Sequence, residues 1–457
     1  MNRYKPVIGL EVHVELKTKS KMFCSCSADY FGKEPNTHTC PVCLGLPGAL
    51  PVPNKKAIEW CVLIGMALNC KVALKSKFDR KNYFYPDLPK GYQISQYDEP
   101  FSAGGYIDLS SGKRIGITRV HMEEDTAKLV HQLGISNAKP VSSKVERLQI
   151  SNEDRFSYVD FNRSGVPLVE IVTEPDFESS EEVIEYLKKL QQIVRYLGVS
   201  NADMEKGDMR LEPNISLRKE GETGLPNYKV EVKNINSFRF VGKAIEFEIK
   251  RHTEILEKGE TPAQETRGFN EDTNVTVSQR SKEEAQDYRY FPDPDIPPIV
   301  WEEKELDMLR SEIPELPWEK VSRYVKDFGI SEQIAQTLAA DLSVAELFDG
   351  AAKLRIEEKV EVKDIANYIV NQKLDPLKVS PDEIIEKIKE KKSGKIEDEG
   401  ELTKFAEEVI KENEVSVASY KAGKETAIQA LIGGMMRKTQ GKADAAKAKE
   451  VLEKLLK

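Results

Sequence analysis

The chain has 457 residues, enough for about three domains, and its 39% hydrophobic and 32% charged residues are typical of a folded, soluble protein. The net charge of −9 excludes a chain-wide basic surface for nucleic acid, and no apolar run approaches the roughly 20 residues that span a bilayer. We therefore expect a cytoplasmic protein without a membrane segment.

The first predicted element is a β-strand over residues 7–16, whose side chains alternate between two faces. Glu11, His13 and Glu15 share one face, and the other face is formed by Leu10, Val12, Val14 and Leu16. Two carboxylates beside an imidazole are suitable ligands for a divalent cation. A solvated face of an amphipathic strand explains the same pattern, and for one strand it is the simpler interpretation.

Four cysteines follow in two close pairs, Cys24 with Cys26 and Cys40 with Cys43. This spacing predicts a tetrahedral zinc site, in which His38 could compete for one ligand position. Four thiolates leave no open position on the metal, so the expected role is structural. Four free thiols in a loop are the alternative.

Two later segments, 78–96 and 279–292, interleave Arg and Lys with Tyr and Phe. Such segments can hold phosphates and stack on bases. They can equally be loops that fold over the core with aromatic plugs, and the residues alone do not decide between these interpretations.

Further polar strand faces are predicted at 119–125, 208–218 and 229–233, where acids alternate with Arg, Lys and Asn. If these strands are neighbours, the acids could hold Mg²⁺ and the basic residues could hold phosphate oxygens. Alternation alone does not show which strands are neighbours. The chain has no Walker P-loop, no convincing dinucleotide fingerprint and no nucleophile elbow, so a nucleotide site would be of another kind.

Helical periodicity appears at 54–69, 179–197 and 238–258 within an otherwise strand-rich region. A proline-rich stretch at 291–298 indicates a linker, after which strand signals almost vanish and amphipathic segments such as 331–349 and 361–371 predict helices. The charged, glycine-containing turn at 391–400 is a possible further boundary. We therefore predict an α+β protein with a mixed or antiparallel sheet domain followed by helices.

The C-terminal segment from residue 421 has a charge opposite to that of the whole chain. It holds nine basic residues against four acidic ones, a local net charge of +5. A solvated helical face is the simpler interpretation of this segment alone.

Seven motifs in order resemble the B subunit of the bacterial tRNA-dependent amidotransferase family. They are 11–16 (EVHVEL), 78–86 (FDRKNYFYP), 92–96 (YQISQ), 121–125 (HMEED), 233–237 (KNINS), 264–267 (QETR) and 287–292 (DYRYFP). The resemblance covers essentially the whole chain.

The resemblance implies a cradle domain at 1–295 with the four-cysteine zinc site, a helical domain at 296–405 and a tRNA-binding tail at 406–457. It implies that ATP phosphorylates the side-chain carboxylate of Glu-tRNA(Gln) or Asp-tRNA(Asn), and that ammonia then displaces phosphate. The implied partners are the glutaminase A subunit, which sends ammonia through a tunnel, the small C subunit, and the misacylated tRNA. The archaeal relative that makes only Gln-tRNA carries an insert for which 457 residues leave no room.

Carried over position by position, the resemblance also implies roles for individual residues. The Mg²⁺ ligands are Glu11, His13, Glu124 and Glu212, and Lys81 with Glu124 lies at the mouth of the tunnel. Weaker nominations for nucleotide or acceptor-end contacts are Arg210, Asn214, Glu231, Lys233 and Arg289. In the tail, Lys438 and Lys442 are nominated for tRNA.

Two of these positions need comment. Many family members have Asp where this chain has Glu212, which changes the reach of the carboxylate. Simple alternation places His121 and Glu123 on one face and Glu124 on the other, so Glu124 can join the set only at a bulge or a strand end.

The competing hypothesis for the whole chain is a noncatalytic, zinc-stabilised tRNA-binding protein. Which aminoacyl-tRNA is the substrate does not follow from the sequence.

Overall fold

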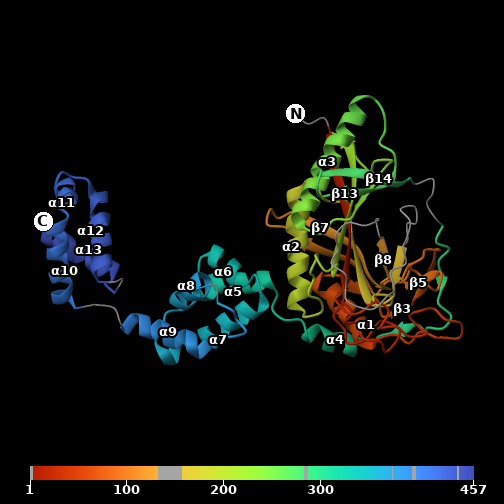
Figure 1. Cartoon of the computed structure of the whole chain (residues 1–457), viewed down its shortest axis with the longest axis horizontal. Helices are drawn as coiled ribbons and strands as arrows, with labels where there is room; N and C mark the ends of the chain where they lie inside the picture. The colour runs from red at the N-terminus through yellow and green to blue at the C-terminus, as the bar shows by residue number, and fades with distance from the viewer. Residues whose placement is uncertain are drawn as a thin grey trace, which may run out of the picture. The chain divides into compact units, whose positions relative to one another are not determined.

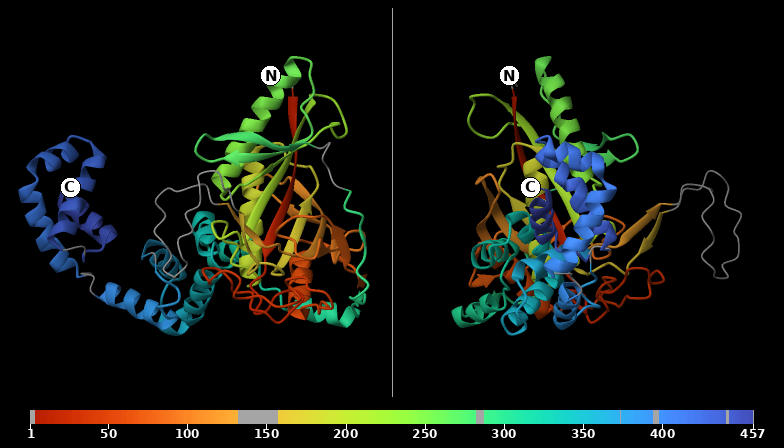
Figure 2. Two further views of the ribbon diagram at one scale, coloured as in Figure 1. Left: turned by 45° about the vertical axis from the view of Figure 1, so that its right-hand side comes forward. Right: turned by 90° about the vertical axis from the view of Figure 1, so that its left-hand side faces the viewer.

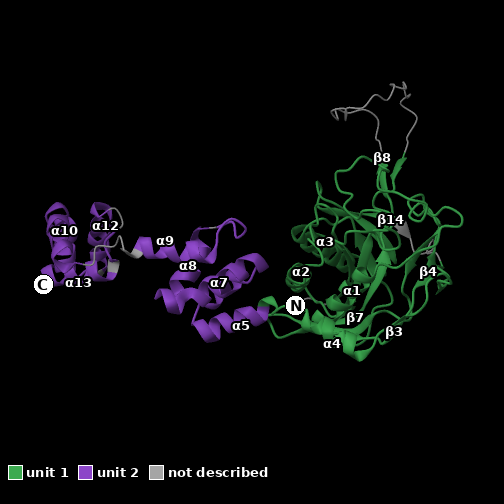
Figure 3. Cartoon of the chain, turned by 90° about the horizontal axis from the view of Figure 1, so that it is seen from below, with its two compact units in different colours: residues 1–317 green, residues 318–457 purple. Residues whose placement is uncertain are grey.

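The structure is a computed structural model that describes residues 4–131, 157–281, 287–372, 374–393, 398–439 and 442–456. The chain forms two compact units, residues 1–317 and 318–457 (Figure 3). The sheets lie in the first unit and the second unit is helical (Figure 1). This confirms the predicted α+β class.

One mixed sheet dominates the first unit, in the order β14-β13-β12-β11-β1-β10-β7-β6-β2. All neighbours in it are antiparallel except β12 and β13. Its strands are β1 (Tyr4–Glu15), β2 (Lys71–Val72), β6 (Ser102–Asp108), β7 (Arg114–Glu124), β10 (Pro167–Thr173), β11 (Met209–Lys219), β12 (Val230–Lys233), β13 (Glu265–Asn270) and β14 (Val275–Ser281).

Three helices cover one face of this sheet and bury its apolar side chains. The ribbon views of Figure 2 show the two longest of these helices along that face. The three helices are α1 (Lys55–Ala67), α2 (Ser180–Tyr196) and α3 (Phe238–Glu257). The predicted segments 54–69, 179–197 and 238–258 are therefore confirmed. Ser179 and Ser237 start α2 and α3 as N-caps, since each hydroxyl accepts a backbone N–H of the first turn. With the apolar face covered, polar residues of the same strands are left on the opposite face.

The first unit also contains one three-stranded sheet and two strand pairs among its described residues. They are β15–β4–β5 (Phe291–Pro292, Asp79–Asn82, Tyr92–Ser95), β16–β3 (Ile299–Val300, Lys75–Ser76) and β8–β9 (Lys128–His131, Ser157–Asp160). The first of these brings together the polar, aromatic segments 78–96 and 279–292. Their rings contact one another, for example Tyr83 edge-on to Tyr288 with centroids 5.9 Å apart. Residues 282–286 of the second segment lie outside the described residues.

The helices after the sheets are α4 (Glu303–Ser311), α5 (Pro317–Phe328), α6 (Glu332–Leu338), α7 (Leu342–Glu358), α8 (Val362–Gln372), α9 (Pro381–Ser393), α10 (Glu399–Glu412), α11 (Glu414–Lys421), the 3-10 turn η2 (Glu425–Ala427), α12 (Ile428–Lys438) and α13 (Ala445–Leu456). The predicted segment 361–371 is confirmed as α8. The predicted segment 331–349 is split between α6 and α7, because Asp341 caps a new helix with its side chain. No helix in the described ranges has the length and apolar character to cross a membrane.

The second unit contains two separate apolar cores. One is formed by residues between 324 and 388, the other by residues between 402 and 456. The core of the first unit continues past the proline-rich stretch to Leu306, Leu309 and Leu316. The three-domain division at 295/296 and 405/406 stays a prediction, and residues 394–397 of the possible boundary at 391–400 lie outside the described residues.

Candidate functional site

Strand pairing gathers the polar faces of four strands. Glu11 lies opposite Glu212 of β11, and His13 lies between Arg210 of β11 and Glu170 of β10. Glu170 in turn lies opposite His121 of β7. We call the polar face the set Glu11, His13, His121, Glu123, Glu170, Arg210 and Glu212. The predicted polar strands at 7–16, 119–125 and 208–218 thus line one side of one sheet.

The first cluster on this face is the acidic group, Glu11, Glu212 and Glu231. Each offers a carboxylate oxygen within 4.8 Å of the other two, a spacing that a divalent cation with metal–oxygen distances of about 2.1 Å can bridge. Lys233 Nζ lies 2.9 Å from Glu212 and 3.4 Å from Glu231. Burial, with the charge of Glu170 and Glu212, raises the pKa of Glu11. The group therefore has more negative charge than Lys233 alone offsets.

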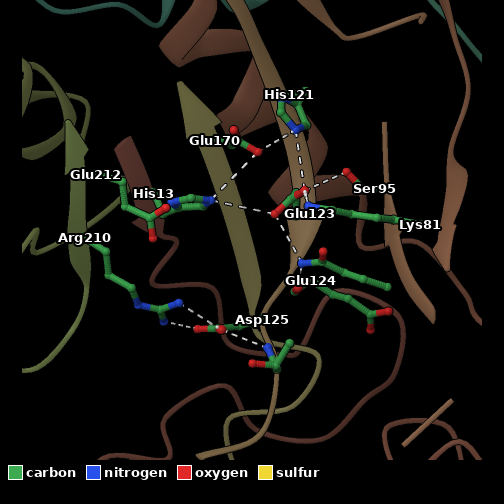
Figure 4. Close-up of polar contacts among 12 residues, drawn as sticks. His13, Lys81, Ser95, His121, Glu123, Glu124, Asp125, Glu170, Arg210 and Glu212 are labelled. Carbon is green, nitrogen blue, oxygen red and sulfur yellow. Dashed lines mark hydrogen bonds and ion pairs between the residues drawn. The ribbon is translucent and has the colours of Figure 1, made fainter. Parts of the chain in front are cut away.

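The second cluster is the His–Glu group, His13, His121, Glu123 and Glu170 (Figure 4). His121 Nε2 lies 3.0 Å from Glu170 and 3.6 Å from Glu123. His13 Nε2 faces the same two carboxylates at 3.8 and 3.9 Å. Glu123 also accepts hydrogen bonds from the Ser95 hydroxyl at 2.7 Å and the Gln93 amide at 3.2 Å.

Opposite charges in the His–Glu group outweigh the effect of burial. Burial alone would lower the pKa of His121, but the charge of Glu170, with hydrogen bonds to Glu123 and Glu170, raises it to about 9. Burial would raise the pKa of Glu170, but His121 lowers it to about 2. Near neutral pH His121, Glu123 and Glu170 are thus charged although they are buried.

His121→Gln tests this cluster through the pH dependence of stability. The pKa of about 9 lies above the ordinary value of 6.5, so the contribution of His121 is fully present below pH 6.5 and is lost as pH rises through 9. We expect the unfolding free energy of wild type to exceed that of His121→Gln by about 3 kcal/mol more at pH 6 than at pH 10. Denaturant unfolding of both proteins across this range measures the difference, and a difference that does not change with pH would contradict the charged cluster.

Lys81 and Glu124, nominated together for the tunnel mouth, have different partners in the structure. Lys81 Nζ lies 3.7 Å from Glu123 and 5.1 Å from the centroid of the Tyr288 ring. Glu124 is paired with the ammonium of Lys90 and accepts the Ile94 backbone N–H at 2.9 Å.

The bulge that would turn Glu124 toward His13 is absent from the described strand. Pairing of β7 with β10 is regular from Arg119 to Glu124, and the irregularity lies at Val172/Thr173. Strict alternation therefore brings Glu123, not Glu124, to His13. Glu124 is the last residue of β7, and its ion pair with Lys90 keeps it beside the polar face. Its role as a Mg²⁺ ligand stays a prediction.

Arg210 lies in a third cluster at the end of β1. Its guanidinium donates to Asp125 at 3.0 Å and to Glu15 at 3.1 Å, and the Tyr30 hydroxyl donates to Glu15 at 3.0 Å. The structure does not bring Arg210 to the acidic group, although the two share one face. Its nomination as a nucleotide contact gains no support from this placement.

The remaining nominations divide in the same way. Glu231 is a member of the acidic group. Asn214, which donates to Glu11 at 3.0 Å, borders this group together with Lys233. Arg289 is exposed, with φ = +42°, and its carbonyl accepts a hydrogen bond from Asn82 at 2.8 Å.

A cavity of about 400 Å³ opens beside the acidic group. Glu11 and Asn214 lie on its wall, and most of the remaining wall is apolar. The lining residues are Val7, Gly9, Leu10, Glu11, Val172, Thr173, Pro175, Asn214, Ser216, Leu225, Pro226, Asn227, Tyr228, Lys229 and Gln264. The cavity suits a planar, partly apolar group of a ligand whose anionic part reaches the acidic group.

The four cysteines converge as their spacing predicts. Their sulfur atoms all lie within 4.8 Å of one another, and those of Cys40 and Cys43 are 3.8 Å apart. Tetrahedral zinc with Zn–S distances of about 2.3 Å separates sulfurs by about 3.8 Å, so the residues fit a metal. A hydrogen bond from Cys24 lowers the pKa of Cys43 to about 5, so a thiolate forms readily. His38 is outside the group, and its Nδ1 contacts the Thr37 hydroxyl.

Sequence reasoning missed three residues of the site. Glu170 is a single acid in the buried strand β10, which offers no alternating pattern. Lys90 lies in the segment between β4 and β5, where nothing indicates which acid it meets. His121 was placed correctly beside Glu123 on one face, but no role followed from this.

In the second unit the basic tail is partly neutralised. Lys438 Nζ lies 2.7 Å from both Glu408 and Glu412, whereas Lys442 is exposed. Gly433 and Gly434 lie within α12 and do not break it. Gly434 packs against Val409, where a Cβ would approach to 2.8 Å, while Gly433 faces open space. The lack of a side chain at Gly434 therefore lets α12 pack closely against Val409 of α10.

Known protein families and individual relatives match this chain along nearly its whole length. The family described as "GatB/GatE catalytic domain" matches residues 6–307, and the "GatB domain" matches residues 332–456. Similar proteins, each named as the B subunit of aspartyl/glutamyl-tRNA(Asn/Gln) amidotransferase, come from Persephonella marina (44% identical, covering 99% of this chain and 100% of that protein), Thermotoga maritima (43%, 99% and 99%) and Dehalococcoides mccartyi (43%, 100% and 99%). The chain therefore belongs to the GatB family, the B subunits of tRNA-dependent amidotransferases.

Proposed function

We propose that this chain is the kinase and transamidase subunit of the amidotransferase, which converts Glu-tRNA(Gln), Asp-tRNA(Asn) or both into the amidated tRNA. The observation that carries the proposal is the acidic group, which lies between a partly apolar cavity and the His–Glu group. Carboxylates, lysines and a ligand-sized cavity on one sheet face are the parts that ATP-dependent activation of a carboxylate requires.

ATP would place its base in the cavity and its phosphates beside the acidic group. The size and apolar wall of the cavity support this, as does its border with Glu11 and Asn214. Glu11, Glu212 and Glu231 fit Mg²⁺, which when bound would offset the charge on the phosphate oxygens. Lys233 would then exchange its contact with Glu212 for one with a phosphate.

The chemistry is activation followed by displacement. A carboxylate reacts poorly with ammonia because its oxygen is a poor leaving group, whereas phosphorylation turns this oxygen into a good one. The product acyl phosphate hydrolyses in water, so ammonia is best supplied along a sheltered path. The buried Lys90–Glu124 pair and the neighbouring Lys81–Glu123 pair are candidates for the wall of that path.

The proposed partners are the glutaminase A subunit, the small C subunit and the misacylated tRNA, in the cytoplasm. The zinc site would be structural, since its four thiolates leave no position open. Lys442 and the other basic residues of the tail would contact the tRNA backbone. Lys438 is the weaker nomination, because two glutamates already surround its ammonium.

An amidation assay of the assembled complex tests this function. The mixture contains ATP, Mg²⁺, radiolabelled Glu-tRNA(Gln) or Asp-tRNA(Asn), and either glutamine or ammonium. We expect ATP-dependent formation of the amidated aminoacyl-tRNA with both nitrogen donors. If tRNA binds but is neither phosphorylated nor amidated, the noncatalytic tRNA-binding hypothesis replaces this one.

A further inference from the structure

A completely buried lysine lies beside the four-cysteine cluster. Lys21 is 0% exposed, and its Nζ donates to two backbone carbonyls, that of His38 at 2.8 Å and that of Phe161 at 3.3 Å. Within the described ranges, Lys21 forms no ion pair with a carboxylate within 4.0 Å. A buried charge without a close counter-charge is costly, so an anionic group beside Lys21 would stabilise it.

The four-cysteine cluster adjoins Lys21 and becomes a source of negative charge when its thiolates bind a cation. The Lys21 backbone N–H donates to the carbonyl of Cys26 at 2.9 Å, so its main chain is part of the cysteine loop. Its side chain runs along Gly165 next to Cys43: a Cβ built on Gly165 would lie 3.6 Å from Cys43 Cβ and 3.7 Å from Lys21 Cδ. Four thiolates around one divalent cation carry a net charge of −2, which one ammonium reduces to −1.

Glu124 is the alternative counter-charge, because Glu124 Oε2 lies 3.9 Å from the same built atom. However, Glu124 already has the ammonium of Lys90 and the N–H of Ile94. The Nζ of Lys21 is instead held by the carbonyls of His38 and Phe161.

We propose that Lys21 is the counter-charge of a tetrathiolate metal centre and makes the four cysteines bind their divalent cation more tightly. The inference rests on the proposed zinc site, not on the amidation chemistry. Groups around a metal site that tune its ligands typically change its affinity by about 10–100-fold. The negative charge of the metal-bound cluster would thus offset the cost of burying the Lys21 ammonium.

Zinc affinity of the full chain, measured by competition with a chromogenic chelator, tests the proposal. We expect Lys21→Met to weaken zinc binding by about 10–100-fold. Lys320→Met is the matched control, since Lys320 is also buried (7% exposed) but lies 2.6 Å from Asp349 in the second unit. Its zinc affinity should equal that of wild type.

Thermal unfolding with and without zinc separates a counter-charge from a packing role. Zinc should raise the melting temperature less in Lys21→Met than in wild type. Without zinc, the variant should be as stable as wild type or more stable, because an unneutralised ammonium has been removed. Lys21→Gln, which keeps a donor for the carbonyls without the charge, should behave like Lys21→Met even if the latter folds poorly.

Three results would overturn the proposal. Wild-type zinc affinity in both Lys21 variants would remove the charge effect, and an equal loss of stability with and without zinc would leave only packing. If cobalt-loaded wild type lacks thiolate-to-cobalt absorption, the tetrathiolate centre itself is wrong. None of these measurements uses ATP or tRNA, so failure of the amidation proposal leaves them unaffected.

Discussion

Glu212→Gln is expected to lower amidation by about 10²–10³-fold while leaving tRNA binding unchanged. The substitution keeps the shape of the side chain but removes one negative oxygen from the acidic group. Burial would raise the pKa of Glu212, yet Lys233 holds it below its ordinary value, so the wild-type side chain is an anion at neutral pH. Under the proposed function the acidic group binds Mg²⁺ beside ATP, and without this charge it would lose most of its effect. The ATP-dependent conversion of Glu-tRNA(Gln) by the full complex measures the change.

Two controls give the result a single meaning. Glu185 lies on helix α2, away from the polar face, and its carboxylate accepts hydrogen bonds from Ser110 at 2.6 and 2.9 Å. Glu185→Gln removes this carboxylate. It should amidate normally. Raised Mg²⁺ should restore part of the activity of Glu212→Gln, because a weakened site is refilled by mass action. Normal amidation by Glu212→Gln would show that the acidic group has another role, such as neutralising Lys233.

Local sequence rules predicted the three long helices of the first unit and the strands that carry Glu11, His121, Glu212 and Glu231. Alternation over 7–16 placed Glu11 and His13 on the polar side because buried and partly exposed residues alternate from Leu10 to Val14. Helical periodicity predicted α2 and α3 to within one residue. These features depend on contacts between near neighbours, which the sequence shows directly.

The site depends instead on which strands are neighbours. Glu170 joins His13 and His121 only because β10 lies between β1 and β7 in the sheet, although it follows both in the chain. Similarly, Lys90 reaches Glu124 because the small strand β5 lies against β7. Even the resemblance, which covers the whole chain, did not distinguish Glu123 from Glu124 at His13. That distinction depends on the register of one strand pair.

Arg210→Met is expected to be the most damaging single change to stability on the polar face. The Arg210 guanidinium contacts the carboxyl groups of Asp125 and Glu15, which also contact each other. Asp125 is 3% exposed and Glu15 is 7% exposed. Burial and the charge of Asp125 already raise the pKa of Glu15, whereas Arg210 outweighs burial and holds the pKa of Asp125 well below its ordinary value. Without the guanidinium, two carboxylates remain buried together. Removing one partner of such a buried pair costs about 3–5 kcal/mol.

Unfolding at several pH values distinguishes lost charge from lost packing. The depressed pKa of Asp125 means that its contribution is present above its unfolded pKa, about 4, and disappears as pH falls through the folded value. In Arg210→Met the folded pKa of Asp125 rises, so the stability deficit relative to wild type should be largest near pH 7 and shrink toward pH 4.

Adding Glu15→Gln to Arg210→Met should recover part of the stability, because it removes one of the two crowded charges. Arg114→Met, which breaks an exposed pair with Asp108 at 2.8 Å, should change stability little. A deficit independent of pH, or no recovery in the double variant, would mean that Arg210 acts by packing alone. If the folded variant also binds ATP more weakly, Arg210 would regain its nomination as a nucleotide contact, which its present contacts do not support.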